Sequence, residues 1–182
     1  SSSPSIFVAD SGNDRIAVYD FGVSLPSGPA ASIVLGGGGP PADDTLAAPE
    51  RVSLSIGSAA FLFVTDRGNH RVLEFPVSGG LPELVASAQL GQPDFTTAMP
   101  NGHTMNLPRA ICFAGGRMIV ADTDNHRVLI YDTTPQSGDP TPSVVVGQPG
   151  PYDTSPNQGL SGPTAATLRR PTGVATDGTR LV

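Results

Sequence analysis

The septet Asp122-Thr-Asp-Asn125-His126-Arg127-Val128 stands in the chain as the third of three related stretches. The two earlier ones are Asp10-Ser-Gly-Asn13-Asp14-Arg15-Ile16 and Asp66-Arg-Gly-Asn69-His70-Arg71-Val72. The first Asp of each septet follows the previous one by 56 residues. A fixed period of this length is typical of a repeat protein, in which each unit buries its apolar face by stacking on its neighbours. The septets therefore decide the fold.

Short apolar runs rich in β-branched residues lie around the septets, and each is bounded by Gly, Pro, Asn or Asp. Such runs are strand signals with turn residues between them, and no window of a dozen residues has a convincing helical period. The sequence therefore predicts an all-β protein. The runs are Ile6–Ala9, Arg15–Tyr19, Val52–Ile56, Phe61–Thr65, Arg71–Phe75, Leu84–Leu90, Arg117–Ala121, Arg127–Tyr131 and Ser143–Val146.

Two landmarks divide each unit further. A glycine follows the septet Asp by 25 or 26 residues, and a proline then opens the next unit after a loop of variable length. A sheet tolerates little insertion, whereas a surface loop tolerates much more. The glycines are Gly36, Gly91 and Gly147, and the prolines are Pro49, Pro108 and Pro171.

Each complete unit is thus predicted to hold four antiparallel strands, which is a blade of a β-propeller. We expect strands two to four of a first blade in residues 1–48, full blades in 49–107 and 108–170, and the inner strand of a further blade in 171–182. A closed propeller has about four to eight blades. The chain, which starts at Ser1 and stops inside a strand, is expected to be an excerpt of a longer protein, or half of a ring that two copies complete.

The septet is predicted to connect strands two and three. Its Asp is expected to accept backbone N–H groups two residues on, Asn or the neighbouring Gly12 or Gly68 to take the left-handed conformation, and Arg to tie strands or blades together. Because every unit carries the set, a structural role is preferred over a metal or substrate site. The residues concerned are Asp10, Asn13, Arg15, Asp66, Asn69, His70, Arg71, Asp122, Asn125, His126 and Arg127.

The composition excludes several kinds of partner. The net charge is −6, and all ten basic residues are arginine. Such a chain lacks the basic field that nucleic acid favours, so no nucleic-acid partner is expected. No apolar stretch approaches the roughly 20 residues of a membrane helix, so no membrane insertion is expected. The single cysteine, Cys112, lies in an apolar run and is interpreted as a buried small side chain.

The segments Pro171-Thr-Gly173-Val174-Ala175-Thr-Asp177-Gly178 and Val120–Val128 resemble the NHL-repeat family, whose pattern runs Pro-x-Gly-Val-Ala-x-Asp and then Val-Ala-Asp-x-x-Asn-His-Arg-Val. The first septet departs from it, since Asp14 replaces His. The resemblance implies a β-propeller, often six-bladed, of a bacterial and exported type, and therefore an extracellular or cell-envelope location. It implies binding platforms for some members and metal-dependent lyases or lactonases for related propellers.

Function is expected on the loop rim, by which we mean the loops Gly36–Pro49, Gly91–Pro108 and Gly147–Pro171. Variable loops gathered on one face often mark the binding face of a repeat protein. A non-catalytic propeller that binds a protein, peptide or glycan is the leading hypothesis, and a metal-dependent lyase or lactonase with its site in the central channel is the alternative. No cofactor, metal ligand or catalytic residue is predicted. The rim residues proposed for the ligand are Asp94, Phe95, His103, Tyr152 and Asp153.

Overall fold

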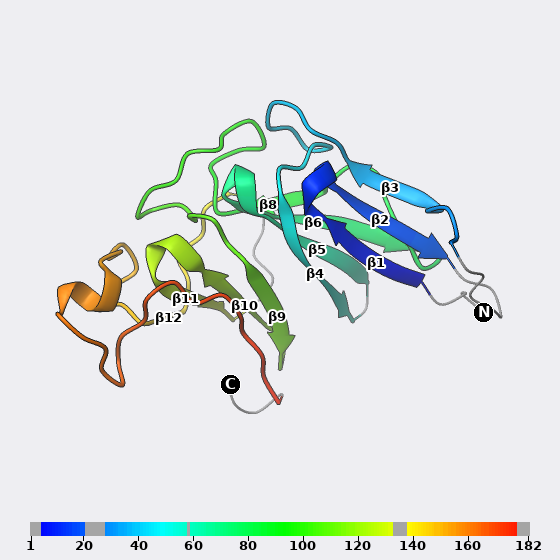
Figure 1. Ribbon diagram of the computed structural model, residues 1–182. Helices are drawn as coiled ribbons and strands as arrows, with labels where there is room; N and C mark the ends of the chain where they lie inside the picture. The colour runs from blue at the N-terminus through cyan, green and yellow to red at the C-terminus, as the bar shows by residue number, and fades with distance from the viewer. Residues whose placement is uncertain (1–4, 21–27, 58, 133–137, 178–182) are drawn as a thin grey trace.

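The chain forms three antiparallel sheets that follow one another along an arc (Figure 1). The computed structural model describes residues 5–20, 28–57, 59–132 and 138–177, and no α-helix is present in these ranges. The all-β prediction is confirmed, and the arrangement is consistent with an incomplete propeller of the NHL type. The described part of the predicted further blade, residues 171–177, contains one β-bridge at Thr176, and residues 178–182 lie outside the described residues.

The sheets correspond to the repeats. The first has the order β1-β2-β3, the second β4-β5-β6-β7 with β8 also paired to β6, and the third β12-β11-β10-β9. The first sheet consists of β1 (Ser5–Asp10), β2 (Arg15–Asp20) and β3 (Ile33–Gly36). The second consists of β4 (Pro49–Ile56), β5 (Ala60–Asp66), β6 (Arg71–Ser78), β7 (Leu81–Pro82) and β8 (Ala88–Leu90). The third consists of β9 (Ala110–Ala114), β10 (Arg117–Asp122), β11 (Arg127–Tyr131) and β12 (Val144–Val146).

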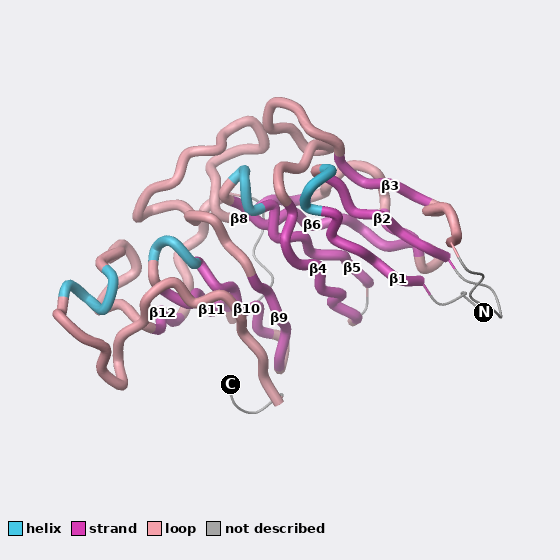
Figure 2. The backbone as a smooth tube through the Cα atoms, viewed as in Figure 1, coloured by secondary structure: helices cyan, strands magenta, loops and turns pink. Residues whose placement is uncertain are grey.

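Each septet forms the hairpin connection between two strands, as predicted. The Asp ends the first strand, the Arg begins the second, and the two are paired in register. One short 3-10 turn lies between them in each repeat: η1 (Ser11–Asn13), η2 (Arg67–Asn69) and η3 (Thr123–Asn125). The fourth 3-10 segment, η4 (Pro156–Gly159), lies in the last long loop. Figure 2 shows the three septet turns on the same edge of the arc as the long loops.

Two apolar cores join the sheets face to face. The first core lies between the first and second sheets, and the second core lies between the second and third sheets. Because alternate residues of a strand point to opposite faces, the strands of the second sheet contribute to both cores: Phe63 of β5 belongs to the second core, while Leu62 and Val64 belong to the first. The blades are therefore held by stacking.

The three landmark glycines have positive φ angles and each contacts an apolar side chain near the end of the loop that follows. A Cβ at Gly91 would lie 2.6 Å from a side-chain carbon of Met105. Gly36 and Gly147 meet Leu46 and Leu168 at the same distance. Each of these apolar residues stands three places before the opening proline. The glycine thus fixes where a loop of variable length returns to the sheet.

Candidate functional site

The septet arginines of the second and third repeats are buried, and each donates hydrogen bonds to backbone carbonyls of the loop rim. Arg71 donates from Nε to Asp66 at 2.7 Å, from Nη1 to the carbonyl of Phe95 at 2.5 Å, and from Nη2 to the carbonyls of Ala42 and Thr45 at 2.8 and 3.0 Å. Because these carbonyls belong to two successive loops, one guanidinium holds both loops against the sheet. A planar fork of donors is needed to reach them together.

Two details of the septet differ from the prediction. The left-handed residue is the fifth one, Asp14, His70 or His126, with φ of 53°, 56° and 55°, and not the Asn or Gly before it. The septet Asp accepts no backbone N–H of its own turn, although the Asn side chain of that turn donates to it at 3.0 Å in the second and third septets. Its carboxylate faces the Arg side chain instead, and in the second septet it accepts the N–H of Ala47 at 2.7 Å. Contacts with distant loops therefore accompany both features, beside the bond that Asn makes to Asp within the septet.

The fifth septet residue connects one blade to the next. Nδ1 of His70 accepts the backbone N–H of Leu107 at 3.1 Å, and Nδ1 of His126 accepts that of Arg170 at 3.0 Å. In the first septet the carboxylate of Asp14 accepts the N–H of Ala48 at 2.7 Å. Aspartate can therefore replace histidine in the first septet, since either side chain accepts a backbone N–H from the end of the loop. Burial lowers the pKa of both histidines, which favours the neutral ring that this bond requires.

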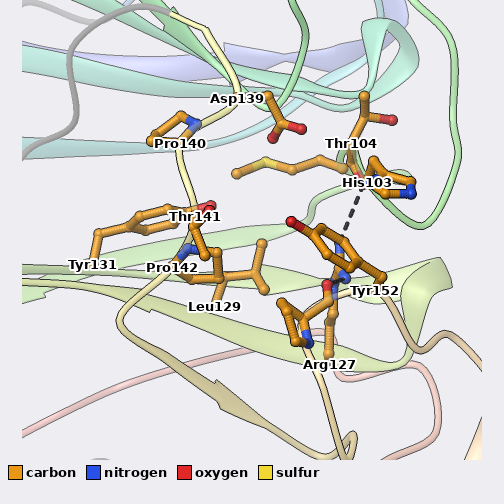
Figure 3. A pocket seen from close by; sticks show the side chains of 12 residues that line it. His103, Thr104, Arg127, Leu129, Tyr131, Asp139, Pro140, Thr141, Pro142 and Tyr152 are labelled. Atoms are coloured by element: carbon orange, nitrogen blue, oxygen red, sulfur yellow. Dashed lines mark hydrogen bonds between the residues drawn. The ribbon is translucent and has the colours of Figure 1, made fainter.

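A pocket of about 230 Å³ opens between the second and third blades at the loop rim (Figure 3). Three loop segments and one strand build it. We call it the interblade pocket, and its lining residues are His103, Thr104, Met105, Arg127, Leu129, Tyr131, Asp139, Pro140, Thr141, Pro142, Pro151 and Tyr152.

The buried Arg127 positions two of the three loop segments. Nη1 donates to the carbonyls of Gly102, at 3.0 Å, and of Pro151, and Nη2 donates to the carbonyl of Thr104 at 3.2 Å. Gly102 allows the segments to approach closely, because a Cβ there would lie 2.7 Å from the carbonyl oxygen of Tyr152. A single buried side chain thus brings residues 102–104 beside residues 151–152.

This approach stacks two rings at the mouth of the pocket. The rings of His103 and Tyr152 lie 4.2 Å apart between centroids, with an interplanar angle of 28°. The Asn101 side chain fixes the backbone that carries the first ring, because its Oδ1 accepts the backbone N–H groups of His103 at 2.7 Å and Thr104 at 3.0 Å. Figure 3 shows the hydroxyl end of Tyr152 directed into the pocket. The pair forms a fixed aromatic wall.

Two ionisable groups lie on the opposite side of the pocket. Burial raises the pKa of Tyr131, and the nearby carboxylates of Asp139 and Asp122 add to this, so its hydroxyl stays protonated and can donate. Asp139 is an exposed residue that points toward the pocket in Figure 3, and partial desolvation of its carboxylate raises its pKa. Within the described ranges the Asp139 carboxylate has no hydrogen bond or ion pair. Arg127, by contrast, is paired with Asp122 at 2.7 Å.

The corresponding place between the first and second blades is filled. Phe95 stands three residues after Gln92, as Pro151 stands three residues after Gln148, and the two carbonyls accept the same Nη1 of the septet arginine. The Phe95 side chain packs against the first core, whereas proline leaves that volume open.

A second difference keeps the pocket open. Ala86 is buried in the first core, and its N–H donates to the carbonyl of Asp43 at 2.9 Å. Pro142 stands 56 residues later in the chain and has no N–H to make the same closure. The interblade pocket is therefore open because Pro151 stands in place of a side chain such as Phe95, and because Pro142 lacks the N–H that Ala86 donates.

The structure brings two of the five predicted rim residues together. His103 and Tyr152 line the interblade pocket, and Asp153 follows Tyr152 as an exposed neighbour outside its lining. Phe95 packs against the first core, and the carboxylate of Asp94 accepts hydrogen bonds from the hydroxyls of Thr96 and Thr97. Asp94 and Phe95 therefore do not belong to the pocket.

Sequence reasoning missed the other side of the pocket. Asp139 lies in a stretch without a strand or motif signal, and Tyr131 was interpreted only as part of a strand. The available signal was the chain of prolines at 140, 142, 149 and 151, which flank a strand instead of interrupting one. Because proline has no backbone N–H, a segment with so many prolines donates few hydrogen bonds to the loops beside it.

Comparison with known families gives one match: the NHL repeat, at residues 105–131. This segment runs from the buried Met105 through β9, β10 and the third septet to Tyr131, so the matched repeat forms one wall of the interblade pocket. Comparison with curated proteins gives no match. Among the described residues, no helix has the length and apolar character needed to cross a bilayer.

Proposed function

We propose that the chain is a non-catalytic binding module that recognises a protein, peptide or glycan through the loop rim, with the interblade pocket as its central contact. The observation that carries this proposal is the pocket itself. It lies at the loop rim, it combines an aromatic wall with an unpaired carboxylate, and its walls are fixed by a buried arginine. Binding sites commonly combine an apolar lining with a few well-placed polar groups.

The size of the pocket supports a macromolecular ligand. Its volume of about 230 Å³ is below the range of roughly 300–1,000 Å³ that is usual for small-molecule sites. One amino-acid side chain or one sugar ring fits such a space. The remainder of the ligand would then lie across the neighbouring loops of the rim, which is the arrangement expected for a chain-like partner.

The lyase or lactonase alternative stays a prediction for the complete ring. The inner strands β4 and β9 and residues 174–176 line an open hollow of about 450 Å³. Glu50, at the start of β4, is engaged by Arg67 at 3.3 Å and Arg109 at 3.2 Å. Within the described part of the chain, no three His, Cys, Asp or Glu residues gather as a metal site. No specific observation there favours the enzyme.

The test is a selection from a random peptide display library and a glycan array, each run on the 182-residue chain and on Pro151→Phe. The variant introduces the plug that Phe95 provides at the first interface. Ligands that enrich on the wild-type chain and are lost on the variant support the proposal. Enrichment that is equal on both proteins, or no enrichment of either ligand class, contradicts it.

A second variant protects the test against misfolding. Tyr152→Ala removes the aromatic wall from an exposed position, so it leaves the core intact. Its melting temperature should match that of the wild-type chain while the selected ligand binds more weakly. Unchanged binding by Tyr152→Ala would show that the ligand lies elsewhere on the rim.

A further inference from the structure

We propose that the interblade pocket takes the side chain of a lysine or arginine from a partner polypeptide, with its aliphatic stem between the apolar walls and its cationic head at Asp139. This inference rests on the proposed function, because it names the chemistry that the same pocket selects. Three properties carry it: the charge left uncompensated in the pocket, the shape of the walls, and the prior engagement of Arg127.

The charge of the pocket is negative. Arg127 and Asp122 lie 2.7 Å apart and neutralise each other. The remaining carboxylate among the lining residues is that of Asp139, which interacts electrostatically with Arg127 and His103 but has no hydrogen bond or ion pair within the described ranges, and the chain as a whole carries −6. Asp139 is an exposed residue, so water screens its carboxylate, but a carboxylate at the edge of a pocket that has no ion-pair partner still attracts a cation more than an anion.

The walls fit an aliphatic stem. Pro140 and Pro142 line the pocket with half-buried apolar rings, as Figure 3 shows, whereas Met105 and Leu129 are almost fully buried and form its floor. A lysine or arginine stem packs on such surface while its charged end reaches a polar group. The aromatic ring and hydroxyl of Tyr152 lie at the mouth, where a ring face or an oxygen atom stabilises a nearby cation.

An anionic ligand fits less well, because the one cation of the pocket is already engaged. Nε, Nη1 and Nη2 of Arg127 donate to Asp122 and to three loop carbonyls. A phosphate or carboxylate would have to displace these bonds and would also lie near Asp139. A cation avoids both costs, so the observations favour a basic side chain over an acidic group.

The test uses two blocked amino acids that differ in charge and hardly in shape. Nα-acetyl-arginine methylamide and the citrulline analogue are titrated into the ¹⁵N-labelled 182-residue chain, and amide shifts of residues 102–104, 129–131 and 151–152 are followed. We expect the arginine probe to bind with a Kd about threefold lower than the citrulline probe, as an ion pair with an exposed carboxylate predicts.

Two matched variants assign the effect. Asp139→Asn removes the charge and keeps the shape, so the two probes should bind equally. Asp20→Asn makes the same change at an exposed position of the first sheet, which contributes no residue to the pocket, so the preference should persist. Equal affinity of both probes for the wild-type chain, or a preference that survives in Asp139→Asn, would overturn the inference.

The failure of this inference can be told apart from failure of the proposed function. Library peptides that depend on the open pocket but share no basic residue, or glycans that depend on it, would refute the basic side chain and leave the binding module standing. Enriched peptides with a lysine or arginine at one fixed position, which lose affinity for Asp139→Asn, support both. The absence of pocket-dependent ligands of any kind refutes both.

Discussion

Replacement of Arg71 by lysine should destabilise the protein although the positive charge is kept. The guanidinium makes four hydrogen bonds, to the Asp66 carboxylate and to the carbonyls of Ala42, Thr45 and Phe95. An ammonium group is a single point of donors and cannot reach groups on several sides, so at least two of these bonds are lost. A buried hydrogen bond to a charged group contributes roughly 1.5–3 kcal/mol, so the free energy of unfolding should fall by about 3–6 kcal/mol.

The first repeat supplies the matched control. Arg15 donates to Asp10, but its side chain is 40% exposed, against 0% for Arg71. Arg15→Lys should therefore change stability by an amount close to zero, as is usual for exposed ion pairs. Both variants are compared with the wild-type chain by urea unfolding at neutral pH. Equal losses for Arg15→Lys and Arg71→Lys would refute the view that the buried fork, and not the charge, holds the loops.

Two further predictions concern the contacts between blades. The lowered pKa of His70, from an ordinary value of 6.5, means that the unfolded chain takes up a proton at higher pH than the folded chain. The contribution of His70 to the free energy of unfolding should therefore be fully present above about pH 6.5 and decline below it. His70→Asp, which supplies the same acceptor as Asp14, should weaken this decline, as measured by urea midpoints at about pH 7.5 and 5. A steeper decline in the variant would contradict the acceptor role. Gly91→Ala should cost about 3 kcal/mol, because its φ is 93° and the new Cβ would lie 2.6 Å from Met105. Gly79→Ala, with a φ of 62° and no atom within 4 Å, should cost only about 1 kcal/mol in thermal unfolding, and similar losses for the two would refute the role of the close contact.

The repeat could be predicted from the sequence because the residues that mark each unit recur at nearly fixed spacing along the chain. Septet, glycine and proline recur at fixed positions, and the sheets follow them. The left-handed residue was predicted wrongly because His70 gains its stability from Leu107, which lies 37 residues away in the next repeat. A turn prediction from neighbouring residues favours glycine or asparagine and does not include such a distant donor.

The candidate site was only half predictable for a similar reason. His103 and Tyr152 were placed on the loop rim, but their stacking depends on Arg127 and on a glycine that lets two backbones approach. Whether a pocket opens at all depends on Pro151 standing where another loop has Phe95. That equivalence becomes visible only when the carbonyls are seen to accept the same arginine atom.

The three residues before each opening proline have a practical consequence for protein engineering. In residues 46–48 and 105–107 one backbone N–H donates to the fifth septet residue of the blade that the loop leaves, and the N–H before it donates to the septet Asp of the blade that the loop enters. A blade that is transplanted with a cut at the proline would lose both of these backbone N–H donors. Donor blades should instead be cut just after the landmark glycine and the residue that follows it, so that the transferred blade keeps the residues before its opening proline and the hydrogen bonds that they donate.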